Sequence, residues 1–187
     1  MDLWICFSVD LYIMASKDNS FVRSWFLIID DDIPENLRPD YNSTVNEIQT
    51  ILDSRGSWRD YGYVFKNICR TCGESLRRNK RNWKHCIEVH LTLPENIVKI
   101  CGLSNNLSCA NVSDNIIYFN LSRWLYGSHE SGLSHKAYLR YVCRHEFGHI
   151  LGRGHIKPRR GELCPIMYQQ TISDGSCIPN TNVLPFE

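Results

Sequence analysis

The sequence predicts a single domain of the α/β class built around one sheet. Two observations lead to this expectation: apolar runs of strand length recur along the chain, and two segments with helical periodicity lie among and after them. After the second helical segment, glycine and proline recur up to the C-terminus, which predicts irregular structure there. The length of 187 residues fits one domain with its own buried core.

The composition is that of a folded protein with nearly balanced charge. Apolar residues make up 43% of the chain and charged residues 22%, which excludes disorder throughout. Lys and Arg number 21 against 20 Asp and Glu, so the net charge of +1 gives no reason to expect a nucleic acid or a membrane surface as partner. No apolar run reaches the roughly 18 residues that a transmembrane segment needs.

Residues 1–20 are expected to form an N-terminal extension. Their first apolar run covers about seven residues between Asp2 and Asp10 and has an acidic start, whereas a secretory signal normally begins with Lys or Arg. Three alternatives remain open for this segment: a first strand, a cleaved signal, or residues upstream of a true start at Met14.

The first half of the domain is expected to contain two strands and a helix. Trp25–Asp30 is a β-rich apolar run that ends in an acidic cluster and Pro34. Thr44–Glu47 fits a capping box, and the helix that follows is expected to end at Gly56. Its apolar face consists of Val45, Ile48, Ile51 and Leu52. Residues 63–68 are predicted to be a second strand.

The middle of the chain predicts two further strands and one loop. The basic segment Arg77–Lys84 is expected to be a solvated loop, with a phosphate-binding patch as the alternative. Apolar and polar residues alternate from Ile87 to Leu93, so His90 is expected to point away from the core. Asn115–Asn120 is apolar on both faces, which favours a strand in the interior of the sheet. Residues 97–114 show no regular pattern.

A long helix is expected at the start of the last third of the chain. Ser134 is placed to cap it, and its apolar residues continue to Leu151, over roughly 18 residues or about 27 Å. Gly152 and Gly154 end it. Residues 152–187 are then expected to form an irregular C-terminal subdomain.

Three histidines in and after this helix have the spacing of metal ligands. His145 and His149 are four residues apart, so they lie on the same face of the helix one turn from each other. Gly152 can take the left-handed conformation that breaks the helix, which lets His155 return to the same ion. Three protein ligands with a fourth position left for water are typical of catalytic zinc.

Glu146 is expected to be the general base of this site. It follows His145 directly, so its carboxylate lies beside the metal, where it can take a proton from metal-bound water. By chance, a chain of this composition contains the pattern H-E-x-x-H only about 0.01 times. The alternative is a site that binds zinc structurally or no longer catalyses.

The segment His145–His155 resembles the extended motif H-E-x-x-H-x-x-G-x-x-H of the metzincin zinc peptidases. The resemblance implies a mixed twisted sheet, two main helices, one catalytic Zn²⁺, and a methionine turn beneath the metal, a role that it gives to Met167. Residues 57–180 are also similar to an uncharacterised metzincin-type family found mostly in secreted actinobacterial proteins. The segments that match are Cys101, Ser108–Cys109, Asn120–Trp124 and Pro165–Thr171. This resemblance implies a fold and a reaction class but no substrate.

The chain departs from the metzincin pattern after the methionine. Several metzincin groups have a tyrosine two residues after it, where the hydroxyl can assist catalysis. Here Gln169 holds that position and Tyr168 is adjacent to Met167, which argues against a role for Tyr168 in stabilising the oxyanion.

Nine cysteines exceed ordinary intracellular use, and the odd number leaves at least one unpaired. Cys69 and Cys72 form a C-x-x-C motif, for which a disulfide, free thiols, a redox pair and half of a zinc site all remain open. The pairs Cys101–Cys109 and Cys164–Cys177 each flank a short loop and match positions in the secreted relatives, which implies two disulfides. Cysteine usage and the resemblance favour a secreted protein, although no clear signal peptide precedes the domain.

Together these observations predict that residues 1–187 are one zinc-dependent endopeptidase domain. A metal-bound water, assisted by Glu146, would attack the peptide carbonyl of a peptide or protein substrate. Two alternatives remain: an inactive module that keeps zinc for stability and binds a partner protein, and a zinc hydrolase of a non-peptide amide. The sequence does not specify the oligomeric state.

Overall fold

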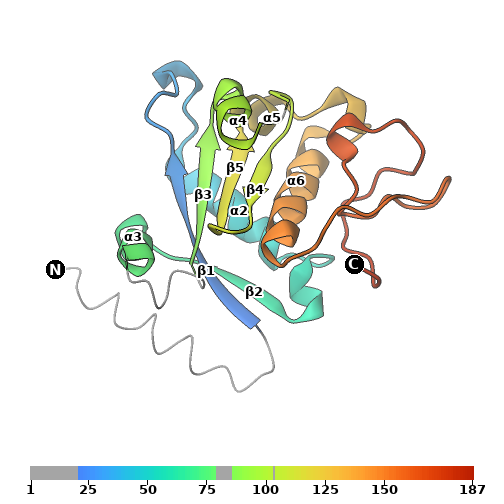
Figure 1. The fold of residues 1–187 in the computed structure, drawn as a ribbon, viewed down its shortest axis with the longest axis horizontal. Coiled ribbons are helices and arrows are strands. Elements are labelled where there is room, and N and C mark those ends of the chain that lie inside the picture. The colour runs from blue at the N-terminus through green and yellow to red at the C-terminus, as the bar shows by residue number, and fades with distance from the viewer. Residues whose placement is uncertain (1–20, 79–85, 103) are drawn as a thin grey trace.

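A mixed sheet of five strands forms the centre of the molecule (Figure 1). The computed structural model describes residues 21–78, 86–102 and 104–187, so the predicted N-terminal extension lies outside the described residues. The strand order is β2-β1-β3-β5-β4, with β4 alone antiparallel to its neighbour. The strands are β1 (Phe21–Ile29), β2 (Tyr63–Asn67), β3 (Cys86–Thr92), β4 (Cys109–Asn111) and β5 (Ile116–Asn120).

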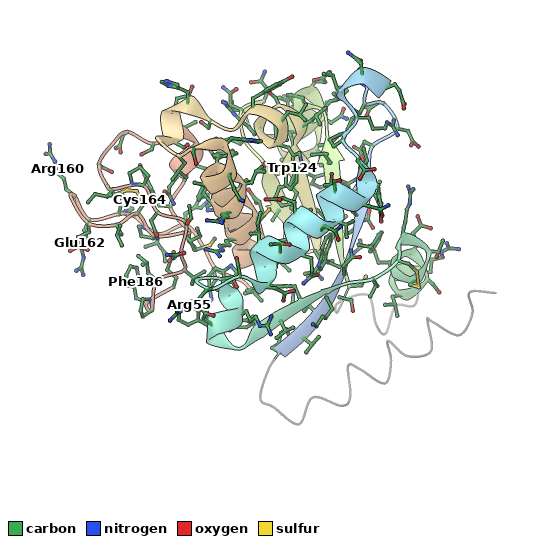
Figure 2. All side chains as sticks on the ribbon, turned by 180° about the vertical axis from the view of Figure 1, so that it is seen from behind. Arg55, Trp124, Arg160, Glu162, Cys164 and Phe186 are labelled. Atoms are coloured by element: carbon green, nitrogen blue, oxygen red, sulfur yellow. A yellow bond between two sulfur atoms is a disulfide. The ribbon has the colours of Figure 1, made fainter. Side chains whose placement is uncertain are left out.

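In the described part of the chain, five α-helices surround this sheet. They are α2 (Tyr41–Asp53), α3 (Arg70–Arg78), α4 (Pro94–Cys101), α5 (Leu121–Tyr126) and α6 (His135–Ile150). Side chains alternate between the two faces of a strand, so Trp25 and Leu27 of β1 join the core with α2 and α6, while Phe26 packs against Gly73 of α3 on the other face. Seen from behind, α2 and α6 lie side by side across the sheet (Figure 2). In the described part of the chain no helix has the length and apolar character of a membrane span.

The strands predicted from apolar patterns are present. β1, β2, β3 and β5 match the predicted segments, and β5 is an interior strand as expected. The irregular region 97–114 contains the end of α4 and the short edge strand β4. His90 points away from the core, as predicted, but it is half-buried between two carboxylates on that face.

The predicted capping box of α2 is wrong by one turn. Asp40 caps the helix, because its carboxylate accepts a hydrogen bond from the backbone N–H of Ser43 at 2.8 Å. The hydroxyl of Thr44 instead donates to the carbonyl of Asp40 from inside the first turn. The apolar face of the helix is as predicted, since Ile48, Ile51 and Leu52 are buried.

The predicted loop at Arg77–Lys84 is wrong at its first two residues. Arg77 and Arg78 end helix α3, which begins at Arg70, directly after Cys69. Only Cys72 and Gly73 of this helix are buried, so its sequence has no apolar stripe from which a helix is recognised. Residues 79–84 of the basic segment, and with them the alternative of a phosphate-binding patch, lie outside the described residues.

Helix α6 and the segment after it agree with the prediction. Ser134 caps the helix by accepting from the backbone N–H of Ala137, and Gly152 follows its end with a φ of +82°. The helix lies between the sheet and the C-terminal segment, and is therefore buried along most of its length. Among residues 152–187 the longest regular piece is the single 3-10 turn Gln170–Ile172, and one isolated bridge joins Leu163 to Ile178.

Candidate metal centre

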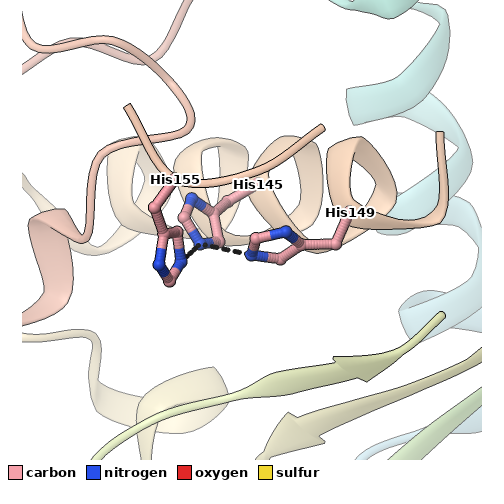
Figure 3. A group of neighbouring side chains, drawn as sticks. All are labelled: His145, His149 and His155. Atoms are coloured by element: carbon pink, nitrogen blue, oxygen red, sulfur yellow. Dashed lines mark hydrogen bonds between the residues drawn. The ribbon is translucent and has the colours of Figure 1, made fainter. Parts of the chain in front are cut away.

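The three predicted histidines meet at one point beside α6 (Figure 3). The Nε2 atom of His145 lies 3.2 Å from Nε2 of His149 and 3.3 Å from Nε2 of His155. The three ligand atoms all lie within 4.8 Å of one another. This group can hold a metal ion.

The local backbone explains why His155 reaches the other two. After α6, the N–H of Gly152 bonds to the carbonyl of His149, and the N–H of Arg153 bonds to the carbonyl of Gly148. This is the double hydrogen bond of a helix end with a left-handed glycine, which turns the chain back on itself. The N–H of Ile156 then bonds to the carbonyl of Met167. His155 therefore lies between two backbone contacts that fix its approach.

Hydrogen bonds to the backbone set the tautomers of the two helical histidines. Nδ1 of His145 lies 2.8 Å from the carbonyl oxygen of Ile166, and Nδ1 of His149 lies 2.8 Å from that of Arg153. A carbonyl oxygen only accepts, so each Nδ1 carries the proton and each Nε2 presents a lone pair to the common point. Two lone pairs that face each other at 3.2 Å repel unless a cation lies between them.

The histidines are also held in the neutral state that metal binding requires. Burial, together with the neighbouring His149, lowers the pKa of His145 to about 3. Burial likewise lowers the pKa values of His149 and His155.

Met167 lies in a turn that packs against the helix between the ligands. Its side chain is fully buried, and a Cβ added at Gly148 would lie only 2.5 Å from its Sδ. The preceding residue, Ile166, supplies the carbonyl that holds His145. The structure thus brings the predicted Met167 to the helix turn that separates His145 from His149.

Glu146 is a buried carboxylate next to the first ligand. The residue is 4% exposed, and its side chain makes no hydrogen bond or ion pair with the described residues. Burial raises the pKa of Glu146 to about 8. A carboxyl group whose pKa is shifted this far by burial is typical of functional sites.

Tyr168 is engaged elsewhere. Its hydroxyl donates to the carboxylate of Asp174 at 3.0 Å, within the C-terminal segment. Gln169 accepts a hydrogen bond from the hydroxyl of Tyr141, whose ring lies 5.4 Å from that of His145.

Two supporting residues of the site were not predicted from the sequence. Arg144 is buried and donates to oxygens of residues 54–55 and 181–182, so it ties α6 to both of these distant segments. Glu187 accepts hydrogen bonds from the backbone N–H groups of Met167 and Leu184. Helix α6 also contains Lys136, Arg140 and Glu146, so nothing in the sequence distinguished Arg144, and Glu187 had no signal either.

The structure contains three disulfides in its described part. Cys101–Cys109 and Cys164–Cys177 are the two predicted pairs, and Cys69–Cys72 is the third. Cys164 lies in the C-terminal segment, inward of the loop tip that bears Arg160 and Glu162 (Figure 2). The described thiols of Cys86 and Cys143 are buried and unpaired.

Comparison with known proteins places the chain in a family without supplying a function. No curated protein and no solved structure matches it. One family, DUF3152, described as a protein of unknown function, matches residues 40–181. This range includes the three histidines, Glu146 and Met167. Because the match spans well over half of the sequence, the chain belongs to the DUF3152 family.

Proposed function

We propose that this protein is a zinc-dependent endopeptidase of the metzincin type. The observation that supports it most is the convergence of three neutral imidazoles on one point, with the Nδ1 atoms of the two helical rings bound to backbone carbonyls. Such outer hydrogen bonds are typical of histidines that bind a metal, because they fix the tautomer and the ring orientation.

The donor set favours zinc. Zinc lies about 2.0–2.1 Å from histidine nitrogens in tetrahedral sites, which places two nitrogens of one site about 3.3–3.4 Å apart. The Nε2–Nε2 distances of 3.2 and 3.3 Å from His145 are close to that value. Three nitrogen ligands leave one position open, as in catalytic rather than structural zinc sites.

Zinc held by these residues would act as a Lewis acid toward water and toward the carbonyl oxygen of a peptide bond. Glu146 would take a proton from the attacking water and later deliver it to the leaving amine nitrogen. Burial raises the pKa of Glu146 to about 8, and the positive charge of zinc bound at the histidines would lower it again, toward the ionised form that accepts a proton.

The experiment that tests this proposal combines metal analysis with digestion of a denatured protein mixture. We expect one zinc per chain and cleavage that a chelator abolishes. Glu146→Gln should keep zinc and fold but cleave about a hundredfold more slowly or worse, because it removes the base without removing a ligand. Glu162→Gln is the matched control, since Glu162 is exposed at a loop tip and should cleave as the wild type does.

Other outcomes would favour the two alternatives. A zinc-loaded wild type that cleaves no peptide in a broad library would indicate a binding module with a structural metal. Hydrolysis of small amides without peptide cleavage would indicate a non-peptide amide hydrolase. Equal cleavage by Glu146→Gln and wild type would refute the role of Glu146.

We also propose that the protein works in an oxidising, extracellular setting. The three disulfides support this, because disulfides persist mainly in secreted proteins. Thiol mapping of protein recovered from its natural source should find these pairs oxidised, and six free thiols in active protein would contradict the proposal.

A further inference from the structure

We propose that Cys69 and Cys72 form a reversible redox site that exchanges its disulfide with thiols. The site lies at the start of α3, on the face of the sheet opposite α6, the helix that contains His145 and His149 (Figure 1). It therefore stands independently of the proposed peptidase function.

The two residues of the disulfide differ sharply in exposure. Cys69 is exposed, whereas Cys72 is 3% exposed. Of the six half-cystines described, only Cys69 is exposed. Thiol–disulfide exchange requires a thiolate to reach a sulfur atom, so an incoming thiol reaches this disulfide more readily than the other two, and it does so at Cys69.

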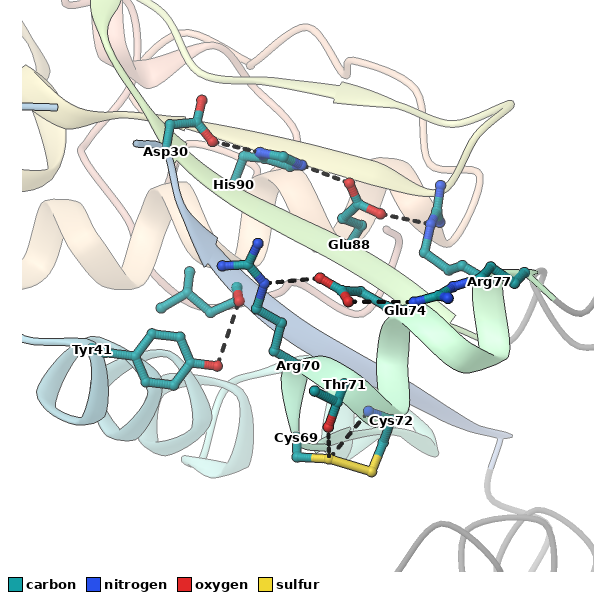
Figure 4. A network of polar contacts seen from close by, with 12 residues as sticks. Asp30, Tyr41, Cys69, Arg70, Thr71, Cys72, Glu74, Arg77, Glu88 and His90 are labelled. Carbon is teal, nitrogen blue, oxygen red and sulfur yellow. Dashed lines mark hydrogen bonds and ion pairs between the residues drawn. A yellow bond between two sulfur atoms is a disulfide. The ribbon is translucent and has the colours of Figure 1, made fainter. Parts of the chain in front are cut away.

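The surroundings of Cys69 stabilise a negative charge on its sulfur. Cys69 directly precedes α3, and its carbonyl accepts the N–H of Gly73 as the helix begins. Its Sγ accepts a hydrogen bond from the N–H of Cys72 at 3.2 Å and lies 3.4 Å from the hydroxyl of Thr71 (Figure 4). The N-terminus of a helix lowers the pKa of a thiol in a C-x-x-C motif, so Cys69 is both an accessible sulfur and a good leaving group.

Helix α3 does not depend on the disulfide for its position. Gly73 packs against the ring of Phe26, where a Cβ would lie only 2.1 Å away. At the other end of the helix, Arg77 pairs with Glu88 of β3 at 2.7 Å. The disulfide closes a ring of only four residues, which constrains the unfolded chain less than the longer rings closed by the other two disulfides. Opening it should therefore leave the fold in place.

The exchange proceeds in two balanced steps. A thiolate attacks Sγ of Cys69, a new sulfur–sulfur bond forms, and the Cys69–Cys72 bond breaks with its electron pair on Sγ of Cys72, which takes up a proton. A second reagent thiolate then attacks the sulfur of the first one, which is now bonded to Cys69. This releases Cys69 as a thiolate, which is in turn protonated. The two reagent thiols become one disulfide and give two electrons to the protein, whose disulfide becomes two thiols.

The first experiment is a redox titration of the full chain in glutathione buffers of increasing ratio of reduced to oxidised form. After acid quenching, each cysteine is labelled with a maleimide and quantified by peptide mass spectrometry. We expect Cys69 and Cys72 to be labelled together in buffers that leave Cys101–Cys109 and Cys164–Cys177 oxidised. Reduction of all three disulfides at the same ratio, or of Cys69–Cys72 last, would overturn the proposal.

Single-cysteine variants test the asymmetry. Cys72→Ser leaves the exposed Cys69 thiol and should form a mixed disulfide with oxidised glutathione, seen as an added mass. Cys69→Ser leaves the buried Cys72 thiol and should form little mixed disulfide with glutathione. Equal gain by both variants would contradict the assignment of Cys69 as the attacked sulfur, and the titration of the wild type decides the matter if either variant fails to fold.

The pH dependence of alkylation tests the charge stabilisation. In the reduced wild type, the rate at Cys69 should reach half its maximum below the pKa of about 8.5 of a free cysteine. A midpoint at or above that value would mean that α3 does not activate the thiol and that the disulfide is structural.

Discussion

Gly148 lies between the two helical histidines, and the space beside it is already full. A Cβ there would lie 2.5 Å from Sδ of Met167 and 2.6 Å from the Trp58 ring. The same ring donates a hydrogen bond to the carbonyl of Arg144 at 2.7 Å, so it cannot move away without breaking that bond. The glycine is therefore required for the close packing of the Met167 turn against α6.

We expect Gly148→Ala to destabilise the fold by about 1–3 kcal/mol, because the added methyl group overpacks the core. Zinc affinity should fall with it, since the displaced turn includes the carbonyl that holds His145. Gly154→Ala is the control: nothing lies within 4 Å of a Cβ at that position. Denaturant unfolding and zinc competition would measure both variants, and an equal effect of the two would contradict this account.

The second prediction at this scale concerns the third ligand. His155→Ala should lower zinc affinity by at least about a hundredfold, because two histidines remain where three met. It should change the stability of the metal-free protein little, since His155 is exposed. His129→Ala, at another exposed histidine, should retain full zinc occupancy. Full occupancy of His155→Ala under chelator competition would refute the assignment.

At the residue scale, the sequence predicted which side chains meet but not what holds them. His145 and His149 follow from helical periodicity, and the turn at Gly152 accounts for His155. The partners of Arg144 lie about 90 residues before it and about 37 after it, in segments without any periodic pattern. No local rule connects such positions, so the sequence alone did not predict this support.

Two strands are joined on the α3 side of the sheet by a half-buried histidine. His90 of β3 lies 2.7 Å from a carboxylate oxygen of Asp30, just after β1, and 2.7 Å from one of Glu88. Burial alone would lower the pKa of His90, but the hydrogen bonds and charges of the two carboxylates raise it to about 9. Burial would raise the pKa values of Asp30 and Glu88, but His90, together with Thr92 at Asp30 and Arg77 at Glu88, lowers them.

These shifts predict how the stability of the sheet depends on pH. The contribution of His90 to the free energy of unfolding is complete below its ordinary pKa of 6.5 and is lost as the pH rises through about 9. The contributions of Asp30 and Glu88 to this free energy are present above their ordinary pKa values of 3.8 and 4.5 and are lost as the pH falls. The free energy of unfolding from this cluster should therefore be greatest between about pH 5 and 6.5.

The measurement is urea unfolding from about pH 6 to pH 10 for wild type and His90→Gln. The difference between them should shrink as the pH rises, by about 3 kcal/mol at most, because the variant has no charge to lose. His129→Gln should follow the wild type at every pH, since that residue is exposed. A constant difference across the range would show that the His90 charge does not stabilise the sheet.

At the scale of elements, burial decided which segments were predictable. β1, β3 and β5 present buried apolar side chains at alternate positions or throughout, which is the pattern of a strand. Helix α3 buries Cys72 and Gly73 and is otherwise polar, so its position depends on the packing of Gly73 against Phe26. That contact is tertiary, and a local pattern does not contain it.

At the scale of the whole molecule, the disulfide Cys164–Cys177 joins two stretches of the irregular C-terminal segment, which also contains Met167. By chain entropy, a ring of this size contributes about 3 kcal/mol. Replacing both cysteines by alanine should loosen the metal centre more than the sheet. Hydrogen exchange should rise at residues 164–170 and stay unchanged in β1 and β3, with a drop in zinc affinity.

The matched control removes Cys101 and Cys109, which join α4 to the edge strand β4. That double variant should increase exchange around β4 and leave the exchange of residues 164–170 as it was. Equal zinc affinity in both double variants and the wild type would mean that the C-terminal disulfide does not brace the site.

The contacts of Arg144 also fix the order in which this site can be completed during synthesis. A growing chain that has passed His155 already contains all three histidines, yet it lacks the Met167 turn and the oxygens of Thr181 and Asn182 that Arg144 binds. Until those residues leave the ribosome, a buried guanidinium one residue before His145 has only its N-terminal partners, Ser54 and Arg55. The support of the ligands is therefore completed only after Thr181 and Asn182 have been synthesised, later than the three histidines themselves.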